Sequence, residues 1–228
     1  MRGSEKIGMP ELTQFMVLSG VPRELIGLIL MLPIVATIIA FSREVIGIKG
    51  FGVYTPLIIG FAFVETGLIN GIIIFAVVLA SGTLMRILIK HLRLLYLPRM
   101  AMVLSAVAFT IFLMFLAAAF LRETQFLKIS LFPIIIIVSL VEKFIAAQIE
   151  RGPRTAITLT AETLALASSS YLVITWGWLT RLILDWPLGV FAAALVVNIV
   201  LGKWTGLRIT ELIRFKGLMK HLEASARR

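Results

Sequence analysis

Long apolar stretches that alternate with short charged segments form the dominant pattern of this sequence. Seven stretches contain almost no Asp, Glu, Lys or Arg, and a helix needs about 20 such residues to cross about 30 Å of hydrocarbon. They are Leu25–Ser42, Gly50–Val64, Thr66–Met85, Met100–Leu121, Ile129–Val141, Thr155–Thr180 and Trp186–Gly202. Lipid offers no partner to an unpaired backbone group, and the period-2 alternation of a membrane barrel is absent. The pattern therefore predicts an all-α, polytopic fold of about seven transmembrane helices.

Two of the seven stretches are marginal in length. The fifth is long enough only if its helix continues past Glu142 and Lys143. The second contains several glycines and Pro56, which has no N–H and leaves the carbonyl of Gly52 unpaired inside a helix. We predict that the second helix is short or broken. The fifth is a further candidate for a short or broken helix, because its charge-free stretch is short.

The break in the second stretch makes Thr55 and Pro56 candidate residues of a ligand site or transport pathway. Interrupted helices occur in membranes where the freed backbone groups meet protein or water, which is often at a binding site. The alternatives are an ordinary kinked span and a re-entrant hairpin that serves packing alone.

Glu162 is a second candidate, because it lies inside the sixth stretch. It follows Arg154 by eight residues, which is about 12 Å along a helix. A carboxylate at such a depth is costly unless it is paired, protonated or facing protein or water. Helical spacing groups it with several polar neighbours in one stripe, which we predict to face inward: Arg151, Thr155, Thr158, Glu162 and Ser169. We therefore predict that Thr158, Glu162 and Thr163 belong to a ligand or transport pathway. Hydrogen bonding between helices is the structural alternative.

Composition and charge agree with a membrane chain. Hydrophobic residues make up 60% of the sequence and charged residues 15%, whereas soluble domains carry about 25% charged residues. The net charge is +10, and the basic residues lie next to the apolar stretches. This position favours contact with anionic lipid over contact with nucleic acid. Cysteine is absent, and neither His91 nor His221 has a second ligand at metal-binding spacing. Without a nucleotide motif or a nucleophile–base pair, we predict no metal, no cofactor and no enzymatic activity.

The distribution of lysine and arginine predicts the orientation. With seven spans, sixteen of these residues lie on the C-terminal side of the membrane and six on the other side. The excess marks the cytoplasm, so the N-terminus is predicted outside and the C-terminus inside. The predicted division is an extracytoplasmic segment 1–24, a membrane domain 25–202 and a basic cytoplasmic tail 203–228, which is either an amphipathic surface helix or solvated. Arg99, Arg151 and Arg154 would form a cytoplasmic basic patch for an anionic partner.

The sequence also suggests an internal repeat. Leu32-Pro33-Ile34-Val35 matches Phe132-Pro133-Ile134-Ile135, and each opens an apolar run that ends in charge. A glycine loop, a segment rich in Thr and Pro and a full span follow in both halves. The hypothesis is a 3+1+3 parallel repeat of the kind found in some transporters, and chance similarity is the alternative.

Four stretches together resemble a bacterial family of seven-helix membrane domains usually fused to an inactive transglutaminase-like domain. They are YTPLIIGFAF at Tyr54–Phe63, LLYLPRMAMVLS at Leu94–Ser105, IERGPRTAITLTAETL at Ile149–Leu164 and TGLRITELIRF at Thr205–Phe215. The resemblance covers roughly Leu25–Lys216 and extends distantly to the membrane subunit of poly-gamma-glutamate capsule synthesis. It implies a periplasmic transglutaminase-like domain before the helices and a cytoplasmic ATP-grasp ligase as a partner. This chain carries no soluble domain before its first span, so we expect a stand-alone member or a piece reduced to the membrane domain.

These observations lead to one functional prediction and two alternatives. The prediction is a non-enzymatic, multi-pass component of the bacterial inner membrane that anchors, assembles or exports an amide-linked peptide product of the ligase. A secondary transporter of a small solute is the first alternative, and it predicts a central cavity between spans two and six. A structural scaffold for a partner protein is the second, and it predicts no cavity. A homo-oligomer is compatible with each of the three.

Overall fold

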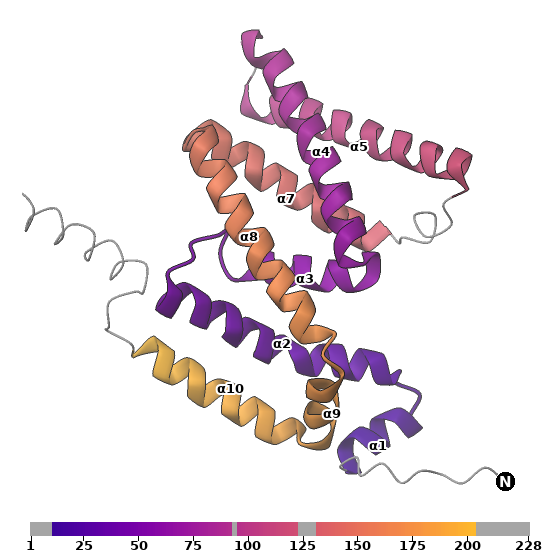
Figure 1. The fold of residues 1–228 in the computed structure, drawn as a ribbon, viewed down its shortest axis with the longest axis vertical. Coiled ribbons are helices and arrows are strands. Elements are labelled where there is room, and N and C mark those ends of the chain that lie inside the picture. Colours follow the sequence, from indigo (N-terminus) through magenta and orange to yellow (C-terminus); the bar gives the residue numbers. More distant parts are fainter. Residues whose placement is uncertain (1–10, 93–94, 123–130, 204–228) are drawn as a thin grey trace, which may run out of the picture. The chain divides into compact units, whose positions relative to one another are not determined.

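The computed structural model describes residues 11–92, 95–122 and 131–203, and every regular element in these ranges is a helix. The α-helices are α1 (Glu11–Leu18), α2 (Arg23–Phe41), α3 (Tyr54–Thr66), α4 (Leu68–Leu88), α5 (Tyr96–Leu121), α7 (Leu131–Glu150), α8 (Pro153–Ile174), α9 (Gly177–Asp185) and α10 (Pro187–Gly202) (Figure 1). A π-helical turn (Ser42–Ile46) follows α2, and a 3-10 turn (Ile89–His91) follows α4. The prediction of an all-α fold is confirmed. The predicted tail, except Lys203, and residues 1–10 of the predicted N-terminal segment lie outside the described residues.

Five of the described helices are long and apolar enough to cross a membrane unaided. They are α2 with its π-helical turn, α4 with its 3-10 turn, α5, α7 and α8. Helix α10 reaches that length only together with α9, from which it is bent by 104°, and α3 is an apolar helix of 13 residues. Helix α7 continues past Glu142 and Lys143 to Glu150, so the fifth stretch meets the condition for a full span, and the expectation that its helix is short or broken is wrong.

Two sequence-based boundaries are wrong. The sixth span does not reach Thr180, because α8 ends at Ile174 and Trp176 has extended backbone before α9 begins. The second span is short, as predicted, but it is not broken in its interior. Helix α3 begins at Tyr54, so Pro56 lies in its first turn, where a missing N–H costs no helical hydrogen bond.

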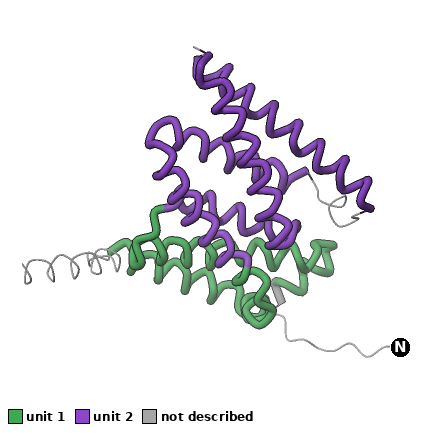
Figure 2. The backbone as a smooth tube through the Cα atoms, turned by 45° about the horizontal axis from the view of Figure 1, so that its top comes forward, with its two compact units in different colours: residues 1–49, 172–228 green, residues 50–171 purple. Residues whose placement is uncertain are grey.

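The chain divides into two compact units, which are described separately (Figure 2). Unit 1 comprises residues 1–49 and 172–228, and in it α2 packs against α9 and α10. Asn198 Nδ2 of α10 donates a hydrogen bond of 2.7 Å to Thr37 Oγ1 of α2, a contact that joins two helices where lipid offers no alternative partner. Helix α9 buries Ile183 and carries the exposed indole of Trp178, and the exposed indoles of Trp176 and Trp186 lie at its two ends.

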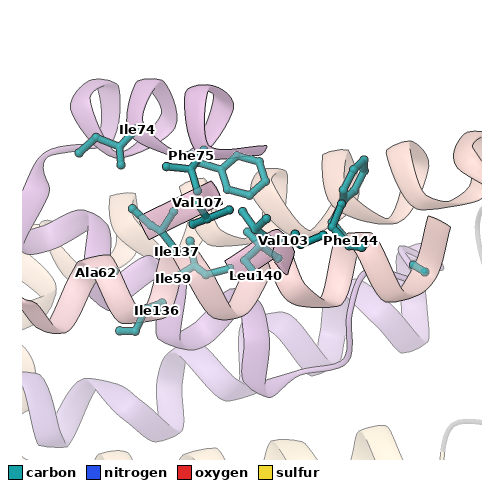
Figure 3. Close-up of a cluster of buried hydrophobic side chains, with 14 of the residues drawn as sticks. Ile59, Ala62, Ile74, Phe75, Val103, Val107, Ile136, Ile137, Leu140 and Phe144 are labelled. Atoms are coloured by element: carbon teal, nitrogen blue, oxygen red, sulfur yellow. The ribbon is translucent and has the colours of Figure 1, made fainter. Parts of the chain in front are cut away.

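Unit 2 comprises residues 50–171, and α7 contacts three of its other helices: α3, α4 and α5. Its core is built from β-branched, leucine and phenylalanine side chains, including Ile59, Phe75, Val103, Val107, Ile137 and Leu140 (Figure 3). Gly82 lets α4 approach α7 closely, since a Cβ there would lie 3.0 Å from Val141 Cγ1. The guanidinium of Arg86 donates to the side-chain and backbone oxygens of Gln148 near the C-terminus of α7, where a cation is favoured by the helix dipole.

Packing within the units bears on the repeat without testing it. Helix α4 packs on α7 in unit 2, and α10 packs on α2 in unit 1. A parallel repeat that pairs α2 with α7 and α4 with α10 expects these two equivalent contacts. The repeat stays a prediction, as does the membrane orientation.

Candidate ligand groove beside a non-helical segment

The chain between α2 and α3 leaves the helical conformation for several residues. The π-helical turn ends at Ile46, and the following segment contains Gly47, Gly50 and Gly52 before α3 begins. These three glycines have φ values of +94°, +44° and +80°. Side chains disfavour this left-handed region, so glycine is what allows the chain to turn here. We call Gly47–Val53 the non-helical segment.

Two side chains of α8 hold the middle of this segment. The backbone N–H of Gly50 donates to Glu162 Oε2, and that of Phe51 donates to Thr163 Oγ1, each at 2.8 Å. Thr163 is fully buried, and its hydroxyl in turn donates to the carbonyl of Leu159 at 2.7 Å. Glu162 and Thr163 therefore accept hydrogen bonds from two backbone N–H groups that have no helical partner, because the segment is not helical.

The segment is anchored well inside the length of α8. Glu162 follows Pro153, the first residue of α8, by nine residues, or about 13 Å along the axis. Helix α3 continues from the segment for 13 residues, which is about 20 Å of a hydrocarbon layer of about 30 Å. Non-helical backbone is tolerated at such depth where it is covered by protein or lines a polar cavity.

A groove of about 380 Å³ lies against the non-helical segment. Its walls are the segment and the C-terminal half of α7: Gly50, Phe51, Gly52, Lys143, Ala146, Ala147, Glu150 and Arg151. A second groove of about 250 Å³ lies between α3 and α7 and is more apolar, with Thr55, Ser139 and Lys143 as its polar residues beside Tyr54. We call these the outer and inner grooves.

Lys143 is the residue common to both grooves. Its ammonium donates a hydrogen bond of 2.7 Å to Thr55 Oγ1, in the first turn of α3. Sequence reasoning missed Lys143, because it was weighed only as a marker of the fifth span's end. The signal was present: if that span continues past Lys143, the lysine is an intramembrane cation and calls for the same attention as Glu162.

The structure brings together four of the five predicted pathway residues. Thr55 and Pro56 are buried at the start of α3, and Glu162 and Thr163 hold the segment that precedes it. Thr158 is exposed, and its hydroxyl donates to the carbonyl of Arg154, so it lies apart from this group.

The predicted inward stripe of α8 is wrong as a description of the buried face. Thr155, Thr158 and Ser169 are exposed, whereas Ala156, Leu159, Thr163, Ala167 and other small or aliphatic residues are buried. Small residues occupy the buried face of α8 because they allow close packing between helices. A threonine or serine hydroxyl can bond to a carbonyl one turn earlier and needs no interior partner, as Ser169 does with Ala165.

The three predicted patch arginines occupy different places. Arg151 lies in the turn between α7 and α8 and lines the outer groove, and Arg154 is exposed in the first turn of α8. Arg99 lies in the first turn of α5 and is half-buried. Arg151 is therefore the arginine placed to meet a ligand in the outer groove.

The location of the grooves bears on the two alternative functions. A secondary transporter was expected to have its cavity between spans two and six, but α3 and α7, spans two and five, line the inner groove. Glu162 binds the non-helical segment and is not among the lining residues of either groove. A purely structural scaffold was expected to have no cavity. Among the described residues, no group of three or more His, Asp or Glu side chains is placed to hold a metal ion.

Apolar helices of membrane-spanning length and a non-helical segment held inside them define an integral, multi-pass membrane protein. The chain belongs to the family described as seven transmembrane helices usually fused to an inactive transglutaminase, whose family model matches residues 11–219. The resemblance to this family is thereby confirmed, and the family description is consistent with a non-enzymatic membrane component. No curated protein and no solved structure matches the chain.

Proposed function

We propose that the chain is a non-enzymatic component of the bacterial inner membrane that anchors, assembles or exports an amide-linked peptide product of a partner ATP-grasp ligase. The observation that carries the proposal is the outer groove, in which an intramembrane lysine meets backbone that is not helical. The lysine ammonium and the polar backbone groups of the non-helical segment suit a ligand that is itself a peptide bearing carboxylates.

The family supports the chemical class of the ligand. A transglutaminase acts on amide groups of peptides, and we propose that the inactive relative fused to such membrane domains still binds them. With the N-terminus outside, a fused domain of this kind would meet the product beyond the membrane. The ligase would release the product on the cytoplasmic side, which is the side that the charge count predicts for the turn between α7 and α8.

Glu162→Gln provides the test of this function. Gln retains an acceptor for Gly50 N–H but loses the charge, and a hydrogen bond to a charged group is stronger than a neutral one by about 1 kcal/mol. We expect the transfer of fluorescent triglutamate across proteoliposomes containing the full chain to fall about fivefold. Glu65→Gln, at the exposed far end of α3, is the matched control and is expected to leave transfer unchanged.

Transfer that is absent for the unmodified chain, with no retention of triglutamate on its proteoliposomes either, would refute the proposed function. Equal transfer by the Glu162→Gln and unmodified chains would instead remove Glu162 from the pathway.

A secondary transporter of a small solute remains the second candidate, because two grooves lie in series along α7. The two functions differ in energy coupling. A secondary transporter accumulates its solute against a gradient when a proton or sodium gradient is imposed on the proteoliposomes. A component that hands on a ligase product moves it down its own gradient.

A further inference from the structure

The inner and outer grooves follow one face of α7. Their lining residues on this helix recur at helical spacing, as Ile136, Ser139, Lys143, Ala147 and Glu150 illustrate. From Ile135 to Glu150 the grooves extend over about 22 Å of the helix axis, which is most of a hydrocarbon layer of about 30 Å. The two grooves are thus neighbouring sections of one route along α7, bordered by the non-helical segment in the outer groove and by α3 in the inner groove.

The character of the route changes at Lys143. The outer section combines backbone of the non-helical segment with Glu150 and Arg151 at its mouth. The inner section is mostly isoleucine and leucine, with Ser139 as a polar residue. The contact between Lys143 Nζ and Thr55 Oγ1 lies where the two sections meet.

The hydrogen-bond partner of Lys143 does not balance the charge of its ammonium group. A lysine inside a membrane usually pairs with a carboxylate, since an unpaired ammonium is costly there. Thr55 supplies a neutral hydroxyl, and within the described residues the structure gives Lys143 no carboxylate partner. The groove that the lysine lines has room for a ligand group that would supply the missing negative charge.

We propose that Lys143 binds an anionic group of the ligand, a carboxylate, and that its hydrogen bond to Thr55 closes the route between the two grooves when no anion is bound. This inference rests on the proposed function for the peptide nature of the ligand. An entering carboxylate competes with the Thr55 hydroxyl for the ammonium. Once Lys143 turns to the ligand, the outer and inner sections form one continuous path.

The chain has no cysteine, so single cysteines report access to each section. The full chain is placed in proteoliposomes of neutral lipid with Ala146→Cys in the outer groove or Ser139→Cys in the inner one. The thiols are labelled with methanethiosulfonate reagents that carry either a sulfonate or a trimethylammonium group. Charged reagents do not enter lipid, so labelling at Ser139→Cys measures water reaching the inner groove.

Two results are expected. Thr55→Val, which keeps the side-chain shape and removes the hydroxyl, raises the labelling rate of Ser139→Cys at least tenfold. Lys143→Met lowers the ratio of sulfonate to trimethylammonium labelling at Ala146→Cys about tenfold, whereas Lys143→Arg keeps the ratio. Lys90→Met, an exposed lysine of the turn after α4, is the control and leaves both readings unchanged.

The source of the anion is tested separately. Triglutamate is expected to protect Ala146→Cys from the sulfonate reagent, and its fully amidated form is not. Protection that anionic lipid alone provides would assign Lys143 to a lipid headgroup and overturn the peptide ligand. A Ser139→Cys rate that is indifferent to Thr55→Val would overturn the closure, and a charge ratio indifferent to Lys143→Met would overturn the anion site.

These outcomes are independent of the function test. Labelling that behaves as expected in a chain that transfers no triglutamate would keep the anion site and reject the proposed export. Transfer without charge selectivity at Ala146→Cys would do the reverse.

Discussion

Thr163→Val is expected to lower the free energy of unfolding by about 2–3 kcal/mol, because the Phe51 N–H loses its acceptor at a buried position. Valine has nearly the shape of threonine, so the loss reports the hydrogen bond rather than a cavity. For a chain of this size such a change lowers the melting temperature by roughly 4–12 °C. Thermal unfolding in detergent, followed by tryptophan fluorescence, measures it.

Thr163→Ser and Thr158→Val separate this effect from general disturbance of α8. Serine retains the hydroxyl acceptor and should keep most of the stability. Thr158 is exposed, so its replacement by valine should change the unfolding free energy by less than about 0.5 kcal/mol. Equal melting temperatures for Thr163→Val and Thr163→Ser would show that the non-helical segment does not depend on this contact.

Gly60→Ala is expected to have an effect of similar size for a steric reason. A Cβ on Gly60 of α3 would lie 2.6 Å from Ser170 Cβ and 3.3 Å from the carbonyl oxygen of Ala167, both on α8. The helices must separate to admit it, and overpacking of this kind costs about 1–3 kcal/mol. The helix propensity gained by replacing glycine offsets up to about 1 kcal/mol of this cost. The melting temperature in detergent is again the measurement.

A double variant identifies the clash. Ser170→Gly removes the Cβ that the new methyl group meets, so Gly60→Ala combined with Ser170→Gly should melt above Gly60→Ala alone. Gly189→Ala in α10 is the control, since a Cβ there meets only Trp186 at 3.8 Å, an ordinary contact. A loss as large for Gly189→Ala as for Gly60→Ala would refute the steric explanation.

Apolar run length predicted the long helices well, because lipid rewards uninterrupted apolar sequence and requires internal hydrogen bonding. The same rule made the fifth span look short, because its charge-free run ends at Val141, whereas α7 continues to Glu150. It failed at Thr180, because Trp176 and Gly177 start a new helix that is apolar enough to look like a continuation.

The candidate site was predictable in part. Glu162 attracted attention as a carboxylate in a costly place and Thr55 through the expected helix break. The structure places Glu162 against the non-helical segment and Thr55 in the first turn of α3. Pairings between distant segments, such as Gly50 with Glu162 and Thr55 with Lys143, lie beyond sequence periodicity. Periodicity describes a single helix and carries no information on which face a neighbour covers. The stripe on α8 was misassigned for that reason.

The bend between α9 and α10 has a consequence for how the protein sits in lipids of different tail length. If α10 crosses the bilayer, α9, which is bent by 104° from α10, runs nearly parallel to the membrane surface. The indoles of Trp176, Trp178 and Trp186 are exposed along this helix and at its bend, and indoles prefer the boundary between headgroups and tails. Sinking or rising would drag all three rings out of that boundary. We therefore expect unit 1 to keep one depth of immersion, so that a thicker or thinner bilayer adjusts its own surface to meet the protein.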